Sequence, residues 1–220
     1  MYKRQVSNEL ARQGIPGKKF VMVIDLSRCK GLKKCQSSCN HMHSIHPGQN
    51  WIKVYPQQEA EHTAPFWQPT TCMHCDEPPC VKVCPVDATF KRQDGIVLID
   101  SDRCIGCRFC MAACPYSTRV FNWEEPHMPM DIANMVSNPE TNLPAKVGTV
   151  EKCDFCPDRA REGLLPPCVE ACPNGVFYFG YIVSWISCYW LFYRKKSFRT
   201  RCSNIRNSEA LRGNGQATFC

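Results

Sequence analysis

The feature that most constrains this chain is a cysteine run, C-x2-C-x2-C-x3-C-P, which extends from Cys104 to Pro115. Its short gaps let one tight loop direct three sulfurs at a single iron–sulfur cluster. The fourth cysteine points away and ligates a neighbouring cluster. The proline after it suits a sharp turn out of the site. Such a run predicts a fold organised around paired clusters rather than around one large apolar core.

The same pattern occurs four times along the chain. The second and fourth groups keep the first C-x2-C pair and the C-x3-C-P ending but have a longer gap between them. Fifteen of the 18 cysteines belong to these groups and are the candidate cofactor ligands, which bind the iron of the clusters. In chain order they are Cys29, Cys35 and Cys39; Cys72, Cys75, Cys80 and Cys84; Cys104, Cys107, Cys110 and Cys114; and Cys153, Cys156, Cys168 and Cys172. The other three, Cys188, Cys202 and Cys220, follow no ligand spacing and are assigned no role.

The first group lacks one cysteine. Leu32 occupies the second position of the run, so fifteen ligands serve sixteen places. Leucine offers no lone pair to iron, and a 3Fe–4S cluster is therefore the favoured expectation here. Two alternatives stay open: a 4Fe–4S cluster with water or hydroxide on its fourth iron, or a substitute ligand such as His41 or His43.

Other cysteine chemistries fit the pattern less well. A zinc site needs four ligands around one small ion, whereas three closely spaced sulfurs suit the face of a larger cluster. A disulfide framework would imply a secreted chain, and the polar, basic segment 1–19 has neither an apolar h-region nor a twin-arginine pair. A redox-active C-x-x-C would need only one pair. Four groups with one shared spacing favour clusters.

The sequence resembles the four-cluster iron–sulfur subunits of dimethyl sulfoxide, polysulfide and tetrathionate reductase complexes. The resemblance is carried by VMVIDLSRC at 21–29, TTCMHCDEPPCVKVCPVDA at 70–88, IDSDRCIGCRFCMAACPYSTRVFNW at 99–123 and VEKCDFCPDRAREGLLPPCVEACP at 150–173. It covers roughly residues 20–180 and extends to the order of the groups, their gaps and the flanking residues.

The resemblance implies which cysteines share a cluster. Groups two and three would form two 4Fe–4S clusters together, and groups one and four would form a third 4Fe–4S cluster and the 3Fe–4S cluster. The implied ligand sets are Cys72, Cys75, Cys80 with Cys114; Cys104, Cys107, Cys110 with Cys84; Cys153, Cys156, Cys168 with Cys39; and Cys29, Cys35 with Cys172. It also implies two partners: a molybdopterin-type catalytic subunit at the end of groups one and four, and a membrane quinone-reacting subunit at the other end. The cluster beside Leu32 would then lie toward the catalytic subunit.

The fold expected is α+β and loop-rich, with two ferredoxin-like modules. Segments 20–24 and 96–99 should be short strands, and short helices should follow the last cysteine of each group. We expect an N-terminal arm (1–19), a double iron–sulfur domain (20–180) with a cysteine-free insertion at 115–152 that grips a partner, and a tail (181–220). The tail is aromatic and then basic. It could be a membrane or interface segment, a strap along a partner, or sequence from a shifted reading frame.

The distribution of charge and the absence of a catalytic motif limit the classes of function that the sequence allows. The net charge of +7 lies mostly in the tail, because residues 1–180 carry a net charge of only +1. No basic footprint for nucleic acid is therefore expected on the body. No catalytic set occurs at useful spacing, so we predict a non-catalytic electron-transfer subunit of an oxidoreductase complex, membrane-associated through its partners. The alternatives are a free-standing polyferredoxin and a zinc-stapled interaction module.

Overall fold

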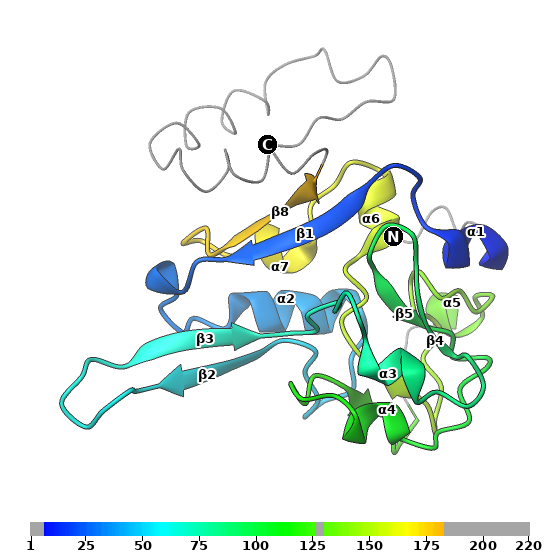
Figure 1. Cartoon of the computed structure of the whole chain (residues 1–220), viewed down its shortest axis with the longest axis horizontal. Coiled ribbons are helices and arrows are strands. Elements are labelled where there is room, and N and C mark those ends of the chain that lie inside the picture. The colour runs from blue at the N-terminus through cyan, green and yellow to red at the C-terminus, as the bar shows by residue number, and fades with distance from the viewer. Residues whose placement is uncertain (1–6, 126–129, 183–220) are drawn as a thin grey trace, which may run out of the picture.

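The computed structural model describes residues 7–125 and 130–182 (Figure 1). Its helices and strands are short, and loops join them, in agreement with the expected α+β class. The elements are, in chain order, α1 (Asn8–Gln13), β1 (Lys19–Ile24), the 3-10 helix η1 (Leu26–Arg28), α2 (Lys34–Met42), β2 (Lys53–Gln57), β3 (Phe66–Thr70), α3 (Pro79–Lys82), β4 (Thr89–Lys91), β5 (Val97–Ile99), α4 (Phe109–Ala112), β6 (Val120–Phe121), α5 (Met130–Ala133), β7 (Val150–Glu151), α6 (Pro157–Arg161), α7 (Pro167–Glu170) and β8 (Phe177–Ile182).

The strands form four separate two-stranded antiparallel sheets: β1–β8, β2–β3, β4–β5 and β6–β7. Pairing of β1 with β8, from Lys19 opposite Ile182 to Ile24 opposite Phe177, brings the first and last strands of the described chain side by side (Figure 1). The expected strands at 20–24 and 96–99 are confirmed as β1 and β5. Both run into a cysteine loop through a turn-forming aspartate. Asp25 accepts the backbone N–H of Ser27 and Asp100 accepts that of Asp102.

The expectation that a helix follows the last cysteine of each group is wrong. Helices α3, α4 and α7 carry the third cysteine of their groups and end before the fourth. The fourth cysteine precedes Pro85, Pro115 or Pro173, and a residue before proline is disfavoured in helical conformation. Asn40 stands in place of that proline in group one, and α2 accordingly continues through Cys39 to Met42.

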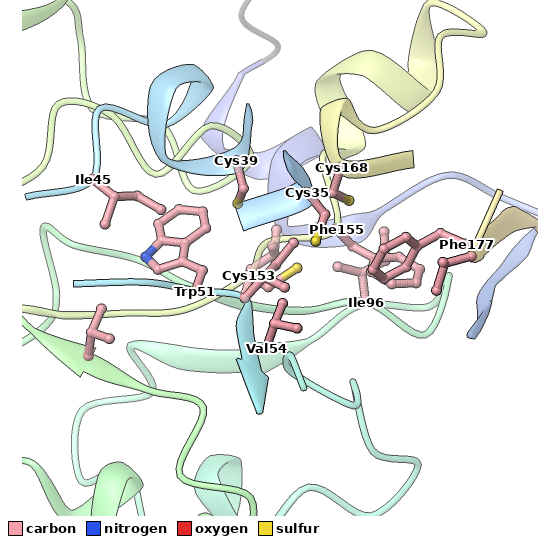
Figure 2. Packing of buried hydrophobic residues seen from close by; sticks show 14 of the residues in the cluster. Cys35, Cys39, Ile45, Trp51, Val54, Ile96, Cys153, Phe155, Cys168 and Phe177 are labelled. Atoms are coloured by element: carbon pink, nitrogen blue, oxygen red, sulfur yellow. The ribbon is translucent and has the colours of Figure 1, made fainter. Parts of the chain in front are cut away.

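Two apolar clusters fill the interior, and both contain cysteines. The larger packs Trp51, Ile52 and Phe177 around four cysteine side chains from groups one and four (Figure 2). Those cysteines are Cys35, Cys39, Cys153 and Cys168. The smaller cluster packs Val97 and Val150 against Cys80 and Cys110 from groups two and three. The side chains of these six cysteines therefore lie within the apolar interior instead of on a surface loop.

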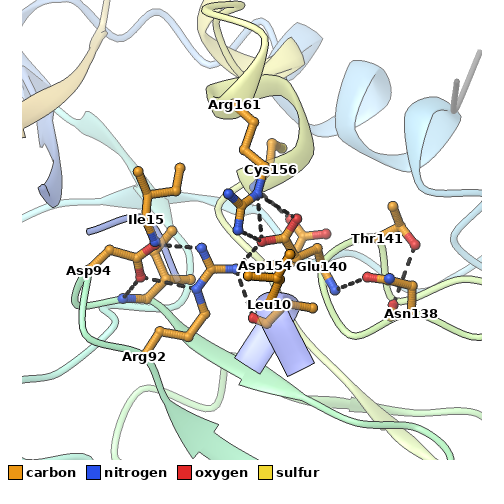
Figure 3. Close-up of polar contacts among 12 residues, drawn as sticks. Leu10, Ile15, Arg92, Asp94, Asn138, Glu140, Thr141, Asp154, Cys156 and Arg161 are labelled. Atoms are coloured by element: carbon orange, nitrogen blue, oxygen red, sulfur yellow. Dashed lines mark hydrogen bonds and ion pairs between the residues drawn. The ribbon is translucent and has the colours of Figure 1, made fainter. Parts of the chain in front are cut away.

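Much of the segment 115–152 folds back onto the chain's own core. Leu143 is 1% exposed, and β6 pairs with β7 at the two ends of the segment. Glu140 is also buried, where it accepts hydrogen bonds from Arg92 and Arg161 (Figure 3). These residues pack within the chain itself, and the expectation that the insertion grips a partner stays a prediction. Burial of Glu140 depends on arginines distant in the sequence, which spacing alone does not reveal.

The expectations for the tail concern residues that the structure mostly does not describe. Residues 183–220, with Cys188, Cys202 and Cys220, lie outside the described ranges, as do residues 1–6 of the N-terminal arm. Within residues 7–125 and 130–182, no helix has the length and apolar character needed to cross a membrane. The alternatives for the tail stay predictions.

Candidate iron–sulfur sites

Two hollows in the structure are each lined by four cysteines drawn from groups two and three. Cys84 joins the first three cysteines of group three at one hollow, and Cys114 joins the first three of group two at the other. The first hollow is lined by Cys84, Cys104, Cys107 and Cys110, and the second by Cys72, Cys75, Cys80 and Cys114. The fourth cysteine of each group thus points to the site of the other group, which is the exchange that the resemblance implies.

A third set of cysteines gathers from groups one and four. Burial raises the pKa of the Cys39 thiol well above its ordinary value, and the nearby Cys153 and Cys168 raise it further. Burial likewise raises the pKa of Cys156, with the charges of Asp154 and then Cys168 adding to it. Figure 2 shows Cys39 of α2, Cys153 of the segment before α6 and Cys168 of α7 near one another. A thiolate in such a place needs a cation to compensate its buried charge.

The fourth set contains three cysteines and the leucine. Burial raises the pKa of Cys35 to about 11, and the nearby Cys172 and Cys29 add to the rise. Leu32 lies in the loop between Cys29 and Cys35, and its side chain is 55% exposed. The structure therefore brings together Cys29, Cys35 and Cys172, as the resemblance implies.

The loop around Leu32 has the backbone of a complete cluster loop. Gly31 and Gly106, which precede Leu32 and Cys107, both have φ of 69°. The residues that follow, Lys33 and Arg108, are left-handed as well, at 55° and 62°. Group one has thus lost a ligand without losing the loop conformation that presents it.

Both glycines are also required by close contacts. A Cβ on Gly31 would lie 2.4 Å from ring atoms of Trp67, and one on Gly106 would lie 2.2 Å from the carbonyl oxygen of Gly148. A side chain at either position would meet a neighbour in addition to the strain of a left-handed backbone. The turn of each loop is therefore held tightly against the strand β3 or the end of the insertion.

The spacing of the sulfurs tests which cofactor these sets fit. A tetrahedral zinc site with bonds of about 2.3 Å holds its sulfurs roughly 4 Å apart. Among the described residues, the ligand atoms of His43, Asp154 and Cys156 lie within 4.8 Å of one another, but no group of three cysteines is spaced closely enough to hold one ion. All fifteen are free thiols rather than disulfides. Sets of soft sulfur ligands that face a common space, but lie too far apart for one ion, fit a larger inorganic cluster.

Polar groups reach several of the sulfurs, and sequence reasoning did not identify them. The backbone N–H of Thr89 lies 3.5 Å from Cys84 Sγ, and the hydroxyl of Thr118 lies 3.5 Å from Cys114 Sγ. Burial tends to raise the pKa of both thiols, but these hydrogen bonds outweigh it and lower the pKa. A threonine four or five residues after the fourth cysteine, in CPVDAT and CPYST, is the signal that could have revealed them.

His43 differs from its sequence-based interpretation as a solvated loop residue, because it is only 4% exposed. Its Nε2 lies 3.5 Å from Cys156 Sγ and its Nδ1 lies 3.5 Å from an oxygen of Asp154. The side chain thus contacts the set of Cys156 and not that of Leu32. His41 is exposed on α2. The structure gives no support to His43 as a substitute ligand beside Leu32.

Comparison with known proteins agrees with this chemistry. The model of the 4Fe–4S dicluster domain matches residues 63–135 and 139–182. The chain is 44% identical over 178 residues to a Halobacterium salinarum protein named as a dimethyl sulfoxide reductase iron–sulfur subunit, covering 73% of this chain and 65% of the relative. It is 37% identical to a selenate reductase subunit of Mesobacillus selenatarsenatis, covering 73% and 60%. It is 39% identical to the iron–sulfur cluster-binding subunit of menaquinone reductase from Nitratidesulfovibrio vulgaris, covering 74% and 75%.

These likenesses span most of the described chain. The matched part amounts to less than two thirds of the length of the first two relatives, although it covers three quarters of the third. The dicluster domain model alone covers more than half of the sequence. The match includes groups two, three and four, and the structure assembles their cysteines as described above. The chain therefore belongs to the family of ferredoxin-type 4Fe–4S dicluster proteins that includes these reductase iron–sulfur subunits.

Proposed function

We propose that this chain is an electron-transfer subunit with three 4Fe–4S clusters and one 3Fe–4S cluster. The observation that carries the proposal is the gathering of fifteen free cysteines into four sets, two of which line hollows with four cysteines each. The clusters would supply the one-electron chemistry. The chain would hold them, bury them and set their potentials through charge and hydrogen bonds. The proposed ligands are the fifteen cysteines named above, with Leu32 in the vacant place.

The neighbours of the sulfurs support an order for the four clusters. Burial raises the pKa of Cys153, and the nearby Asp154 and Cys72 raise it further. Because Cys72 belongs to the second group and Cys153 to the fourth, these two groups lie close together. Cys35 likewise raises the pKa of Cys168, after burial and Cys153. The inferred row starts at Cys84 and its set, passes through the sets of Cys72 and Cys153, and ends at Cys29. The two apolar clusters, one for each pair of sets, support the double-module domain at 20–180.

An exposed apolar surface near the first cluster supports a protein partner at that end. Ile105, Phe109 and Trp123 are each more than 60% exposed. The guanidinium of Arg108 lies 4.9 Å from the centre of the Trp123 ring. Ile105 and Arg108 also line the hollow of Cys84. A docked partner would cover this surface and bring its own redox group close to the cluster.

The partners proposed are a molybdopterin-type catalytic subunit and a membrane quinone-reacting subunit, through which the chain would be membrane-associated. The names of the relatives support the two ends: reductases of dimethyl sulfoxide and selenate on one side, and menaquinone on the other. The alternative is a free-standing polyferredoxin. The nearly neutral charge of residues 1–180 and the exposed apolar surface favour the complex.

Anaerobic affinity purification from the native cell tests this function. We expect the chain to be isolated with two other subunits, identified by mass spectrometry, and its visible cluster absorbance to bleach when a quinol is added. The purified chain should contain iron and sulfide but no stoichiometric zinc. A stable, partner-free monomer with all four clusters would favour the polyferredoxin instead, and a colourless, iron-free protein would exclude both.

The exchange of fourth cysteines gives a separate prediction. In a Cys114→Ala background, adding Cys75→Ala should leave the other three clusters unchanged, because both residues serve one site. Adding Cys107→Ala should alter a second cluster, by conversion or by loss. Iron content and EPR of the reduced protein measure which clusters change. The opposite pattern would show that each group ligates only its own cluster. In that pattern, adding Cys107→Ala would change no further cluster and adding Cys75→Ala would change a second one.

A further inference from the structure

Arg119 is a buried cation with no carboxylate partner in the part of the chain that the structure describes. It directly precedes β6 and is only 4% exposed. Its Nη1 donates to the hydroxyl of Thr89 at 3.2 Å, and its Nη2 is buried without a hydrogen-bond partner among the described residues. No described carboxylate lies within ion-pair distance of it. A charged group in the interior is strongly disfavoured unless an opposite charge compensates it.

The other arginine of comparable burial shows what is missing. Arg92 is 3% exposed, and its guanidinium lies at 2.5 Å from both Asp94 and Glu140. It has the carboxylates that a buried cation normally requires. Arg119 is almost equally buried, yet the oxygen that it contacts through a hydrogen bond belongs to a neutral hydroxyl. Its compensating charge must therefore come from somewhere other than Asp or Glu.

The groups that surround Arg119 are cysteines from two different sets. Its side chain lines the hollow of Cys72, Cys75, Cys80 and Cys114. Thr89, whose hydroxyl accepts the hydrogen bond from Arg119, lines the hollow of Cys84, Cys104, Cys107 and Cys110. Burial raises the pKa of the Cys110 thiol, and the positive charge of Arg119 opposes that rise. The guanidinium thus lies close to both sets of cysteines.

We propose that Arg119 is a counter-ion shared by the two clusters of groups two and three, and that it raises the reduction potential of both. The inference rests on the proposed function, since it requires clusters in these two sets. Reduction adds a negative charge to a cluster, and a buried cation at short range stabilises the reduced form through a weakly screened Coulomb interaction. An arginine keeps its charge at all working pH values, so the effect is permanent. Arg119 acts on the clusters through its positive charge and does not bind their iron.

An EPR-monitored redox titration of the purified complex, with iron and sulfide analysis, tests the inference. Arg119→Gln removes the charge and keeps a donor for Thr89, whereas Arg119→Lys keeps the charge. In the glutamine variant, the ratio of reduced to oxidised cluster at a fixed solution potential should fall at least tenfold. This fall is expected for both clusters of groups two and three. A tenfold change corresponds to about 59 mV for a one-electron couple. The lysine variant should stay near the wild type.

The cluster of Cys29, Cys35 and Cys172 serves as an internal control, because it lies at the other end of the inferred row and its potential should not move. Full iron content with unchanged potentials in Arg119→Gln would overturn the inference alone, as would an equal fall in all four clusters. Should Arg119→Gln fail to load iron, the lysine variant decides: wild-type potentials support the inference and lowered ones overturn it. A wild-type protein without iron would overturn the proposed function and this inference together.

Discussion

Replacing Leu32 with cysteine is expected to convert the proposed 3Fe–4S cluster into a 4Fe–4S cluster. The loop already has the required backbone, since Gly31 matches Gly106 and Lys33 matches Arg108 in left-handed conformation. A cysteine at position 32 would therefore present its sulfur as Cys107 does, without a rearrangement of the chain. The iron content should rise by one iron per chain. The EPR signal of the oxidised 3Fe–4S cluster should disappear, and a reduced 4Fe–4S signal should replace it.

The matched control is Leu32→Ala. Its side chain is also apolar and offers no ligand, and truncating a side chain that is 55% exposed should cost little stability. This variant should keep the wild-type iron content and the 3Fe–4S signal. A wild-type protein that shows no 3Fe–4S signal after oxidation would contradict the assignment. A Leu32→Cys variant with unchanged iron content would mean that the loop does not present its residue to the cluster.

Replacing Glu140 with alanine is expected to destabilise the protein strongly. Glu140 is 3% exposed and accepts hydrogen bonds from Arg92 at 2.5 Å and from Arg161 at 2.7 Å (Figure 3). Its loss would leave the buried Arg92 with Asp94 alone and would detach the segment 115–152 from α6. Removing one partner of a buried ion pair typically lowers the free energy of unfolding by about 3–5 kcal/mol. Anaerobic urea unfolding, followed by tryptophan fluorescence, measures the change.

Glu77 provides the comparison for this prediction. It forms an ion pair with Lys82 at 3.0 Å, but its side chain is 84% exposed. Water screens such a pair, and Glu77→Ala should change the free energy of unfolding by less than about 1 kcal/mol. Similar effects for Glu77→Ala and Glu140→Ala would show that the buried network contributes no more than a surface pair.

The local backbone of the cysteine loops was largely predictable from the sequence. Residue spacing limits which conformations a short loop can adopt, and β1 and β5 follow from short apolar runs before a turn-forming aspartate. The ends of α3, α4 and α7 were also encoded locally, in the proline after each fourth cysteine. That signal was interpreted as a turn alone, and the helices were consequently expected on the wrong side of the cysteine.

Burial of polar side chains was not predictable in the same way. Arg119, His43 and Glu140 resemble surface residues in the sequence, because their types are usually solvated. Each is buried by partners distant in the chain: Arg119 by Thr89 and group two, His43 by Asp154, and Glu140 by Arg92 and Arg161. Whether a charged side chain is buried depends on such partners, and only long-range packing brings them together.

The sequence by itself determined the fifteen candidate ligands, their four groups and the missing ligand at Leu32, because cysteine type and spacing are local properties. The tertiary structure decided which cysteines from different groups meet, since Cys84 and Cys114 reach their hollows only after the chain has folded. It also decided the surroundings of the sulfurs, from the hydroxyl of Thr118 to the guanidinium of Arg119. Those surroundings depend on charge, burial and hydrogen bonds in three dimensions, and such factors set the potentials of iron–sulfur clusters.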